Sequence, residues 1–335
     1  MNDDNIIRFD DTQMPDDKRY TVQDALAALP IKPDELVPPA IIFGFSGMRP
    51  DDVALVGPVW RELPEEQRVI IMERLAEQSE ADYMVDYEVL ARMAYTDPVP
   101  AVRVAALNAN WADESLDNMQ QTATIAHDDP AYSVRAAAFT QVSKYLYLAE
   151  IGELDQDEVE MAKGVALQHA TDAQEHEDVR RLALEALAHT SHPQVAGLIE
   201  NASATDDPAE QASALRAMGH TCDERWNDEV LDGLNHAAPE VSLAAIFAAG
   251  NIGLEDAVEP LQGYIHAPEE EHRYIAVWAL GEIGSEDALR TLADLLDEAA
   301  ESDDDEWLEA IEEALENARM MLELKLTMDM EDDDD

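Results

Sequence analysis

A 31-residue period in the second half of the chain is the feature that most constrains its fold. Four runs, RRLALEALA, QASALRAMG, SLAAIFAAG and RYIAVWALG, begin at residues 180, 211, 242 and 273 and place the same residue types in register. The fourth and seventh positions of every run are alanine, and the fifth is a larger aliphatic residue. This spacing gives each run one broad apolar face when it is wound as an α-helix. The period therefore predicts a set of equivalent helices.

A second apolar pattern follows each run at the same period, with one column at Ile199, Val230, Leu261 and Leu292. The first helix is expected to stop at the ninth position of its run, which is glycine in three of the four repeats, because glycine readily adopts the left-handed conformation that closes a helix. One unit is then a helix, a tight turn, a second helix and a short loop. Such a hairpin buries both of its faces only when it stacks on its neighbours. The sequence thus predicts an all-α fold, an alpha-alpha superhelix (α-solenoid) of stacked helical hairpins.

The first half of the chain repeats the pattern less strictly. The runs AVRVAALNA and SVRAAAFTQV match the first helix, and an earlier unit begins near residue 64. The step from Arg135 to Arg180 exceeds the period, which indicates an insertion near residues 144–156 that forms a protruding loop or a longer helix. Several units open with an acidic N-cap followed by proline at the first helical position. These pairs are Asp97-Pro98, Asp129-Pro130 and Asp207-Pro208.

The patterns divide the chain into four segments. Residues 1–20 are polar and acidic and are expected to be disordered. Residues 21–63 begin with a short helix at TVQDALAAL and then depart from the repeat, as a helical N-terminal cap should. Residues 64–318 hold about seven repeats, and residues 319–335 form an acidic C-terminal tail.

The units resemble HEAT repeats, specifically the short kind named after phycobilisome lyases, which read D-P-x-x-V-R-x-x-A-x-x-A-L-G. The segments DPVPAVRVAALNA and DPAYSVRAAAFTQV carry most of that motif, and EDVRRLALEALA matches from V-R onward. Later units keep the alanines and the glycine but replace the arginine by Gln211 and Ser242. The resemblance covers residues 64–318 and implies a solenoid of the ARM/HEAT type. It is specific for fold rather than function, because such repeats scaffold many unrelated processes.

The chain is strongly acidic: 75 Asp and Glu against 21 Lys and Arg give a formal net charge of −54. Nucleic acid requires a basic surface that neutralises phosphates, and an anionic membrane disfavours an acidic protein, so neither is an expected partner. Two interpretations of the charge remain open. Either the carboxylates form a solvated surface adapted to a salty cytoplasm, or they form a binding surface for basic partners.

Cysteine use and the lack of apolar runs bear on the compartment. Cys222 is the single cysteine, so no intramolecular disulfide forms and a reducing compartment fits. The N-terminus lacks the pattern of a secretory signal, and no stretch approaches the roughly 18 apolar residues of a membrane span. We expect a cytoplasmic, monomeric protein.

No catalytic constellation stands out in the sequence. The phosphate-binding glycine loop, the nucleophile elbow and strand–helix alternation are missing, so no enzyme, catalytic residue or cofactor is predicted. His189 and His220 lie one period apart, with His192 and Cys222 beside them, and imidazole and thiolate are zinc ligands. Their spacing matches no compact zinc motif. They are expected to be polar turn residues, and no metal site is predicted, although metal binding by these four is left open.

The leading hypothesis is a non-catalytic scaffold that holds another protein, which the charge would favour as basic, through a curved acidic surface. We expect that surface to be the concave one, lined by the second helices. The residues predicted to contact the partner are Asn201, Asp228, Asp232, Glu259, Tyr264 and Asp294. The alternative is an accessory or lyase-like role resembling that of the phycobilisome lyases, which help to attach or detach bilin chromophores. Only the shared repeat implies it.

Overall fold

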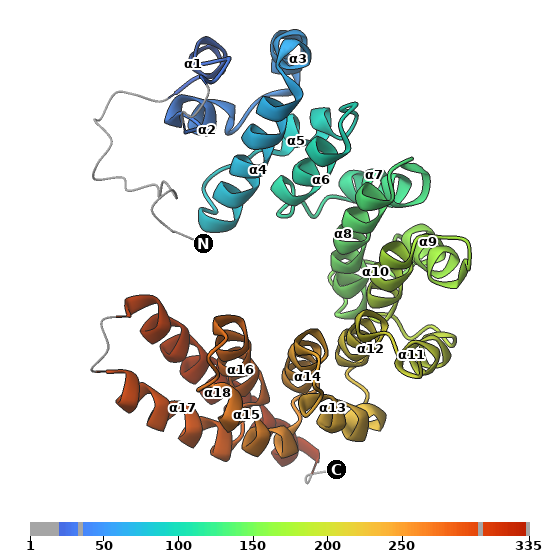
Figure 1. Ribbon diagram of the computed structural model, residues 1–335, viewed down its shortest axis with the longest axis vertical. Helices are drawn as coiled ribbons and strands as arrows, with labels where there is room; N and C mark the ends of the chain where they lie inside the picture. The colour runs from blue at the N-terminus through green and yellow to red at the C-terminus, as the bar shows by residue number, and fades with distance from the viewer. Residues whose placement is uncertain (1–19, 33–35, 301–303, 333–335) are drawn as a thin grey trace. The chain divides into compact units, whose positions relative to one another are not determined.

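The described part of the chain folds entirely as helices and turns. The computed structural model describes residues 20–32, 36–300 and 304–332, and no strand occurs among them (Figure 1). The predicted all-α fold of stacked helical hairpins is confirmed. Residues 1–19 of the predicted N-terminal segment and residues 333–335 of the predicted tail lie outside the described range.

The chain forms two compact units, which the sequence did not predict. Unit 1 comprises Met1–His169 with Ala173–Val179, and unit 2 comprises Ala170–Asp172 with Arg180–Asp335. Unit 1 contains the helices α1 Val22–Ala27, α2 Pro39–Phe45, α3 Val53–Glu62, α4 Glu65–Ala81, α5 Glu88–Ala94, α6 Pro100–Ala109, α7 Leu116–Asp128, α8 Tyr132–Glu150 and most of α9 Glu160–Thr171.

Unit 2 consists of two layers of helices. The 31-residue runs lie in the first helices, α10 Glu177–Leu187, α12 Pro208–Thr221, α14 Pro239–Ile252 and α16 Glu270–Ile283, and α18 Asp305–Asp332 extends this layer. The second helices are α11 Val195–Ser203, α13 Asn227–Leu234, α15 Val258–Tyr264 and α17 Glu286–Ala299. The predicted alanine columns are the core of this packing, since every one is fully buried: Ala183, Ala186, Ala214, Ala217, Ala245, Ala248, Ala276 and Ala279.

The ninth position ends the first helix in the run that begins at residue 180, where α10 stops at Leu187, but not in the three runs that carry glycine there, contrary to the prediction. Three first helices continue for a further turn and end at left-handed residues, Cys222, Gly253 and Gly284, with φ of 49°, 69° and 53°. The glycine column serves another purpose. A Cβ atom on Gly219 would lie 2.8 Å from the Ala248 Cα, and one on Gly250 would lie 3.0 Å from the Ala279 Cα. Glycine therefore lets neighbouring first helices approach backbone to backbone.

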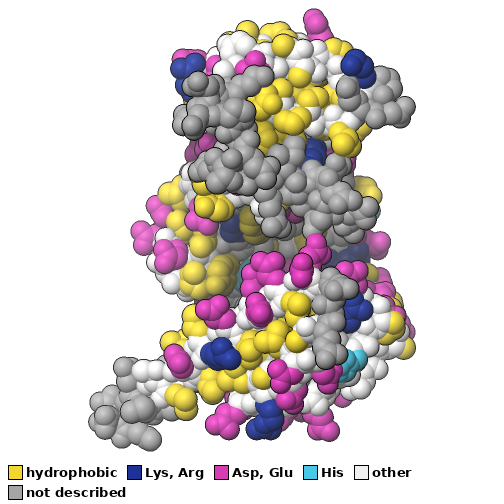
Figure 2. Space-filling model, turned by 90° about the vertical axis from the view of Figure 1, so that its left-hand side faces the viewer, with side chains coloured by type: hydrophobic (Ala, Val, Ile, Leu, Met, Phe, Trp, Pro, Cys, Tyr) yellow, Lys and Arg dark blue, Asp and Glu magenta, His cyan; other side chains and the backbone are white. Residues whose placement is uncertain are grey.

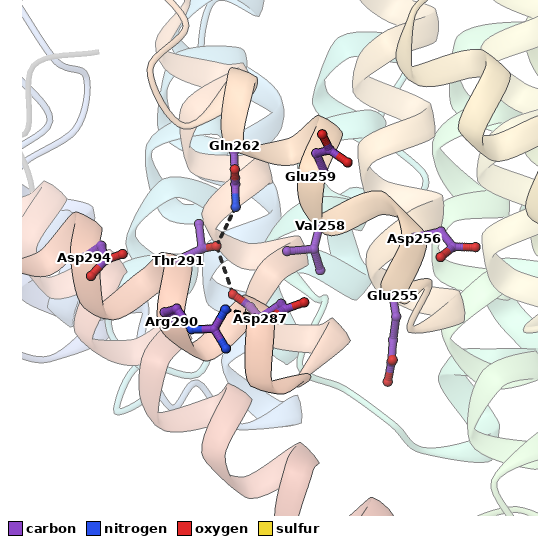
Figure 3. Close-up of a pocket in the computed structure, with 9 residues that line it drawn as sticks. All are labelled: Glu255, Asp256, Val258, Glu259, Gln262, Asp287, Arg290, Thr291 and Asp294. Atoms are coloured by element: carbon purple, nitrogen blue, oxygen red, sulfur yellow. Dashed lines mark hydrogen bonds and ion pairs between the residues drawn. The ribbon is translucent and has the colours of Figure 1, made fainter.

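The backbones of neighbouring second helices in unit 2 approach one another less closely than those of neighbouring first helices do. A groove of about 380 Å³ separates α15 from α17 (Figure 3). An array in which one layer is tighter than the other curves toward the tighter layer, so the first helices line the inner side of unit 2 (Figure 1). The prediction that second helices line the concave surface therefore does not hold for unit 2, whose inner side is formed by first helices (Figure 1).

The Asp-Pro pairs behave in two ways. Asp207 is the N-cap of α12 and Pro208 its first residue, as predicted. In contrast, α6 starts at Pro100 and α8 at Tyr132, so Asp97 and Asp129 lie just before the helices they were expected to cap. Their carboxylates accept the N–H groups of Val99 and Ala131, each at 2.9 Å, and bind arginine side chains of neighbouring repeats.

Two further segments depart from the regular repeat. The excess residues near 144–156 lengthen α8 to Glu150, and a turn then leads to α9, so the predicted insertion is accounted for by a longer helix followed by a loop. The last helix, α18, runs to Asp332, well past residue 318, where the sequence predicted the repeats to end. The proposed division into four segments otherwise stays a prediction.

Candidate functional site

The six residues predicted to contact a partner all lie on second helices. Five are exposed acidic or amide side chains, on α11 (Asn201), α13 (Asp228 and Asp232), α15 (Glu259) and α17 (Asp294). Only Glu259 and Asp294 line the groove between α15 and α17. Across that groove the Gln262 amide donates to the Thr291 hydroxyl at 3.0 Å (Figure 3). Their role in binding stays a prediction, and they lie on the layer opposite the inner face.

Tyr264 has a structural role that the sequence did not indicate. Its side chain is partly buried, and its hydroxyl donates to the backbone carbonyl of Leu234 at the end of α13. Its ring stacks on His272 of α16 with centroids 5.6 Å apart. Tyr264 thus joins three helices of unit 2, and only the remainder of its surface is available to a partner.

The structure pairs the two histidines that lie one period apart. The rings of His189 and His220 are 4.0 Å apart between centroids. Burial lowers the pKa of His189 to about 4 and that of His220 to about 3, with smaller effects of His189 and Arg216 on His220. Both imidazoles are therefore neutral at pH 7, as two rings that pack together in a poorly hydrated position should be.

Cys222 and His192 have local partners. The Cys222 thiol, at the left-handed end of α12, donates to the carbonyls of Gly219 and Asn251 at 3.6 Å, and burial raises its pKa. The His192 Nδ1 accepts the backbone N–H of Gln194 at 3.3 Å. Within the described ranges, no three His, Cys, Asp or Glu side chains gather in a metal-binding arrangement.

A buried charge cluster in unit 1 is satisfied within the fold. The His169 Nδ1 lies 2.8 Å from a Glu175 carboxylate oxygen, and its Nε2 lies 3.2 Å from the His127 Nδ1. Arg135 completes the cluster with a 2.5 Å ion pair to Glu175. Burial raises the pKa of Glu175, but bonds from Arg135, the His176 N–H and His169 outweigh it and lower the pKa to about 2. This cluster connects α8 to the segment before α10.

An aromatic row on the inner face of unit 2 was missed by the sequence analysis. We define the row as His189, His220, Phe247 and Trp278. His220 contacts Phe247 edge to face at 5.5 Å, and Phe247 stacks on Trp278 at 5.4 Å and 14°. Phe247 and Trp278 are partly buried, whereas other aromatic residues of the repeats, such as Phe139 and Trp226, belong to the core.

The period contained a signal for this row. Phe247 and Trp278 occupy the sixth position of their runs, and Glu185 and Arg216 occupy it in the two earlier runs. That column lies outside the alanine positions, and the same positions are joined in the earlier repeats by an ion pair of 3.1 Å between Arg216 and Glu185. A column that changes from a charged pair to an aromatic pair marks a surface rather than a core position.

The row ends in a cleft of about 410 Å³ between α16 and α18, which we call the Trp278 cleft. Its lining residues are Tyr274, Val277, Trp278, Ala310, Glu313, Ala314 and Asn317. Tyr274 also contacts Trp307 edge to face at 5.0 Å, and the Arg273 guanidinium lies over the Trp307 ring at 5.6 Å. The cleft therefore has an apolar, aromatic wall on α16.

Carboxylates surround this aromatic surface. Burial raises the pKa of the Tyr274 hydroxyl, and the charges of Asp304, Glu270 and Glu306 raise it further. Glu313 is exposed at the cleft itself. On the face shown in Figure 2, acidic side chains (magenta) likewise lie among exposed hydrophobic ones (yellow), while Lys and Arg (dark blue) are sparse. An apolar cleft with an acidic rim is suited to a positively charged ligand that also has a flat or apolar surface.

Comparison with known proteins agrees with the repeat architecture. The family profile described as HEAT repeats matches residues 227–316, which span α13 to the first part of α18. This chain contains HEAT repeats. The expectation drawn from the sequence motif is thereby confirmed for the segment that carries the Trp278 cleft. No curated protein matches the sequence.

Solved structures match the chain at low sequence identity, as three examples show. YibA of Escherichia coli is 15% identical, with 85% of this chain and 98% of that chain covered and a TM-score of 0.41. A designed armadillo repeat protein is 18% identical, with 60% and 100% covered and a TM-score of 0.35. Human deoxyhypusine hydroxylase is 15% identical, with 82% and 96% covered and a TM-score of 0.34. At these TM-scores the likeness carries no argument about the function of the HEAT-repeat chain.

No described helix of the HEAT-repeat chain combines the length and the apolar character needed to cross a membrane.

Proposed function

We propose that this HEAT-repeat protein is a non-catalytic scaffold that binds another protein through the inner face of unit 2. The observation that carries the proposal is the Trp278 cleft together with the aromatic row that leads to it. Large aromatic side chains in well-formed concave sites are the usual anchors of protein interfaces, because they bury much area at little cost in side-chain entropy. Phe247 and Trp278 occupy such positions and are not needed to fill the core between the two layers.

The charge supports a basic partner. A net charge of −54 attracts positively charged surfaces over distances of about a Debye length and repels nucleic acid and anionic membranes. Charges at the rim of an interface mainly increase the rate of association and exclude wrong partners, while the buried anchors supply affinity. The acidic rim and the aromatic cleft fit these two tasks. We further propose that the chain acts as a monomer in the cytoplasm.

The absence of catalysis is part of the proposal. The cluster of titratable groups around His169 and Glu175 in unit 1 is held by hydrogen bonds and an ion pair within the fold, which favours a structural role. The paired imidazoles of His189 and His220 have strongly lowered pKa values and are poor bases at neutral pH. The comparisons do not favour the lyase-like alternative.

The proposal is tested by affinity capture from a native lysate with Trp278→Ala and a matched control, Trp111→Ala. Trp111 is 46% exposed and lies in unit 1, so the control removes an exposed indole away from the inner face of unit 2. We expect one partner to be retained by the unmodified chain and by Trp111→Ala, and to be lost with Trp278→Ala. Retention should weaken as the salt concentration rises. A partner held equally by both variants would place the interface elsewhere and overturn the proposal.

A further inference from the structure

We propose that the Trp278 cleft receives an arginine side chain of the partner protein. This inference rests on the proposed function, because it names the chemical group that the inner face of unit 2 recognises. The cleft combines a planar aromatic wall with oxygen acceptors and an acidic rim. A guanidinium is planar, always charged and rich in donors, and it stacks on aromatic faces.

The aromatic wall is held in place by its neighbours. Phe247 of α14 covers one face of the Trp278 indole at 5.4 Å, so the opposite face is the one that borders the cleft toward α18. Gly250 lies against the indole edge, where a Cβ would come within 2.9 Å of the Trp278 Cζ3. An indole fixed in this way presents its π-face to a ligand without a further loss of side-chain entropy.

The acceptors lie on the opposite wall, one helical turn apart on α18. Glu313 offers a carboxylate. The Asn317 side-chain N–H donates to the Glu282 carboxylate at 2.8 Å, and this bond orients the amide so that its carbonyl oxygen is the group left to accept. Two acceptors spaced along one helix suit the several N–H donors of a guanidinium better than the compact ammonium group of lysine.

The same chain already stacks guanidinium groups on indole rings. The Arg273 guanidinium lies 5.6 Å from the Trp307 ring centroid, beside the Trp278 cleft, and that of Arg225 lies 5.8 Å from the Trp226 ring centroid. A long apolar side chain could pack against the aromatic wall. It would, however, take water away from the Glu313 carboxylate without offering it a partner, and burying an unpaired charge is unfavourable. An arginine side chain can stack on the indole of one wall and donate hydrogen bonds to the acceptors of the other.

The test uses the full-length chain labelled with ¹⁵N and follows the indole N–H resonance of Trp278, assigned from its loss in Trp278→Phe. The probes are acetyl-Gly-Gly-Arg-Gly-Gly-amide and its counterparts with lysine, citrulline or norleucine at the centre. We expect the arginine peptide to shift this resonance and to bind about fivefold or more tightly than the lysine peptide. Glu313→Gln should remove most of that preference. Glu312→Gln is the matched control, because it removes the same charge from an exposed neighbour that does not line the cleft.

Four results would overturn the inference, and they separate it from the proposed function. If the lysine peptide bound as tightly as the arginine peptide, the cleft would recognise a basic side chain but not arginine in particular. Equal binding of the norleucine or citrulline peptide would assign the cleft to an uncharged side chain. No shift with any peptide, while the lysate partner still depends on Trp278, would refute the arginine site and leave the scaffold proposal standing. If no peptide shifts the Trp278 resonance and the lysate partner also does not depend on Trp278, both the arginine site and the proposed function are refuted.

Discussion

Arg103 of α6 forms a bidentate ion pair with Asp129. Asp129 lies at the end of α7, where the next repeat begins. The Nη2–Oδ1 and Nε–Oδ2 distances are 2.6 and 2.8 Å, and both side chains are less than a tenth exposed. The Arg103 Nη1 also donates to the carbonyl of Asp97 at 2.7 Å. Arg135 repeats the arrangement with Glu175 and the Asp129 carbonyl. The arginine of the V-R motif therefore connects the loop before its own helix to an acid of the next repeat.

Replacing Arg103 by alanine should destabilise unit 1 strongly, because the Asp129 carboxylate would be left buried without its partner. We expect a loss of about 3–5 kcal/mol in the free energy of unfolding, measured by denaturant titration followed by circular dichroism. Arg290→Ala is the control: Arg290 pairs with Asp287 at 2.8 Å, but both side chains are about two-thirds exposed. Its effect should stay within about 0.5 kcal/mol. Similar losses for the two variants would contradict a structural role for the buried pair.

Gly250→Ala should push α14 away from α16. The new Cβ would lie 2.9 Å from the Trp278 Cζ3 and 3.0 Å from the Ala279 Cα, and the second of these contacts is with backbone that has little freedom to move. We expect a loss of roughly 1–3 kcal/mol in the free energy of unfolding, as for other overpacked cores.

Gly197→Ala provides the matched control for this prediction. Gly197 lies within α11, and a Cβ there would meet nothing within 4 Å. Removing a helical glycine without a clash should raise stability by up to about 1 kcal/mol, since alanine loses less backbone entropy on folding. The two substitutions are expected to change the melting temperature in opposite directions. A melting temperature for Gly250→Ala at or above that of the unmodified chain would show that the layer spacing is not fixed by this glycine.

The paired histidines predict a loss of stability in mild acid. The folded pKa values of His189 and His220 are about 4 and about 3, below the ordinary value of 6.5 that applies in the unfolded chain. As the pH falls below about 6.5, the unfolded chain binds protons that the folded chain does not, so the free energy of unfolding decreases. Their contribution is fully present above pH 6.5 and is lost progressively toward pH 4.

The measurement compares the unmodified chain with His189→Gln/His220→Gln between pH 7 and pH 5, which stays above the ordinary pKa values of aspartate and glutamate. We expect the unmodified chain to lose about 1–2 kcal/mol more than the variant over this interval, a figure reduced to allow for partial solvent exposure of the two rings. The other histidines are common to both proteins and cancel in the difference. Parallel pH profiles for the two proteins would mean that both imidazoles protonate freely in the folded state.

Much of the fold was predictable because it depends on local periodicity. The alanines at the fourth and seventh positions of each run are buried as expected, since the buried face of an amphipathic helix is determined by residues within a few turns of one another. The ends of these helices were predicted less well. Gly219 and Gly250 satisfy the usual pattern of a C-cap, but both lie inside helices, and the capping residues follow three positions later.

The sequence alone did not locate the candidate site. The sequence indicated an acidic binding surface but placed it on the second helices. The direction of curvature depends on how closely helices of different repeats approach, and that distance is set by pairs such as Gly219 and Ala248, which are far apart in the sequence. Phe247 and Trp278 have the helical spacing of core residues, and only their partial exposure distinguishes them from the core.

The sequence by itself determined the repeat unit, its two helices and the acidic character of the surface, because these follow from hydrophobic periodicity and composition. Tertiary structure alone decided which layer is inner, which aspartate each arginine binds, and that a cleft opens beside Trp278. Each of these depends on contacts between repeats. The step from α16 to α18 also departs from the 31-residue period, so the place where Glu313 and Asn317 face the indole could not be extrapolated from the earlier units.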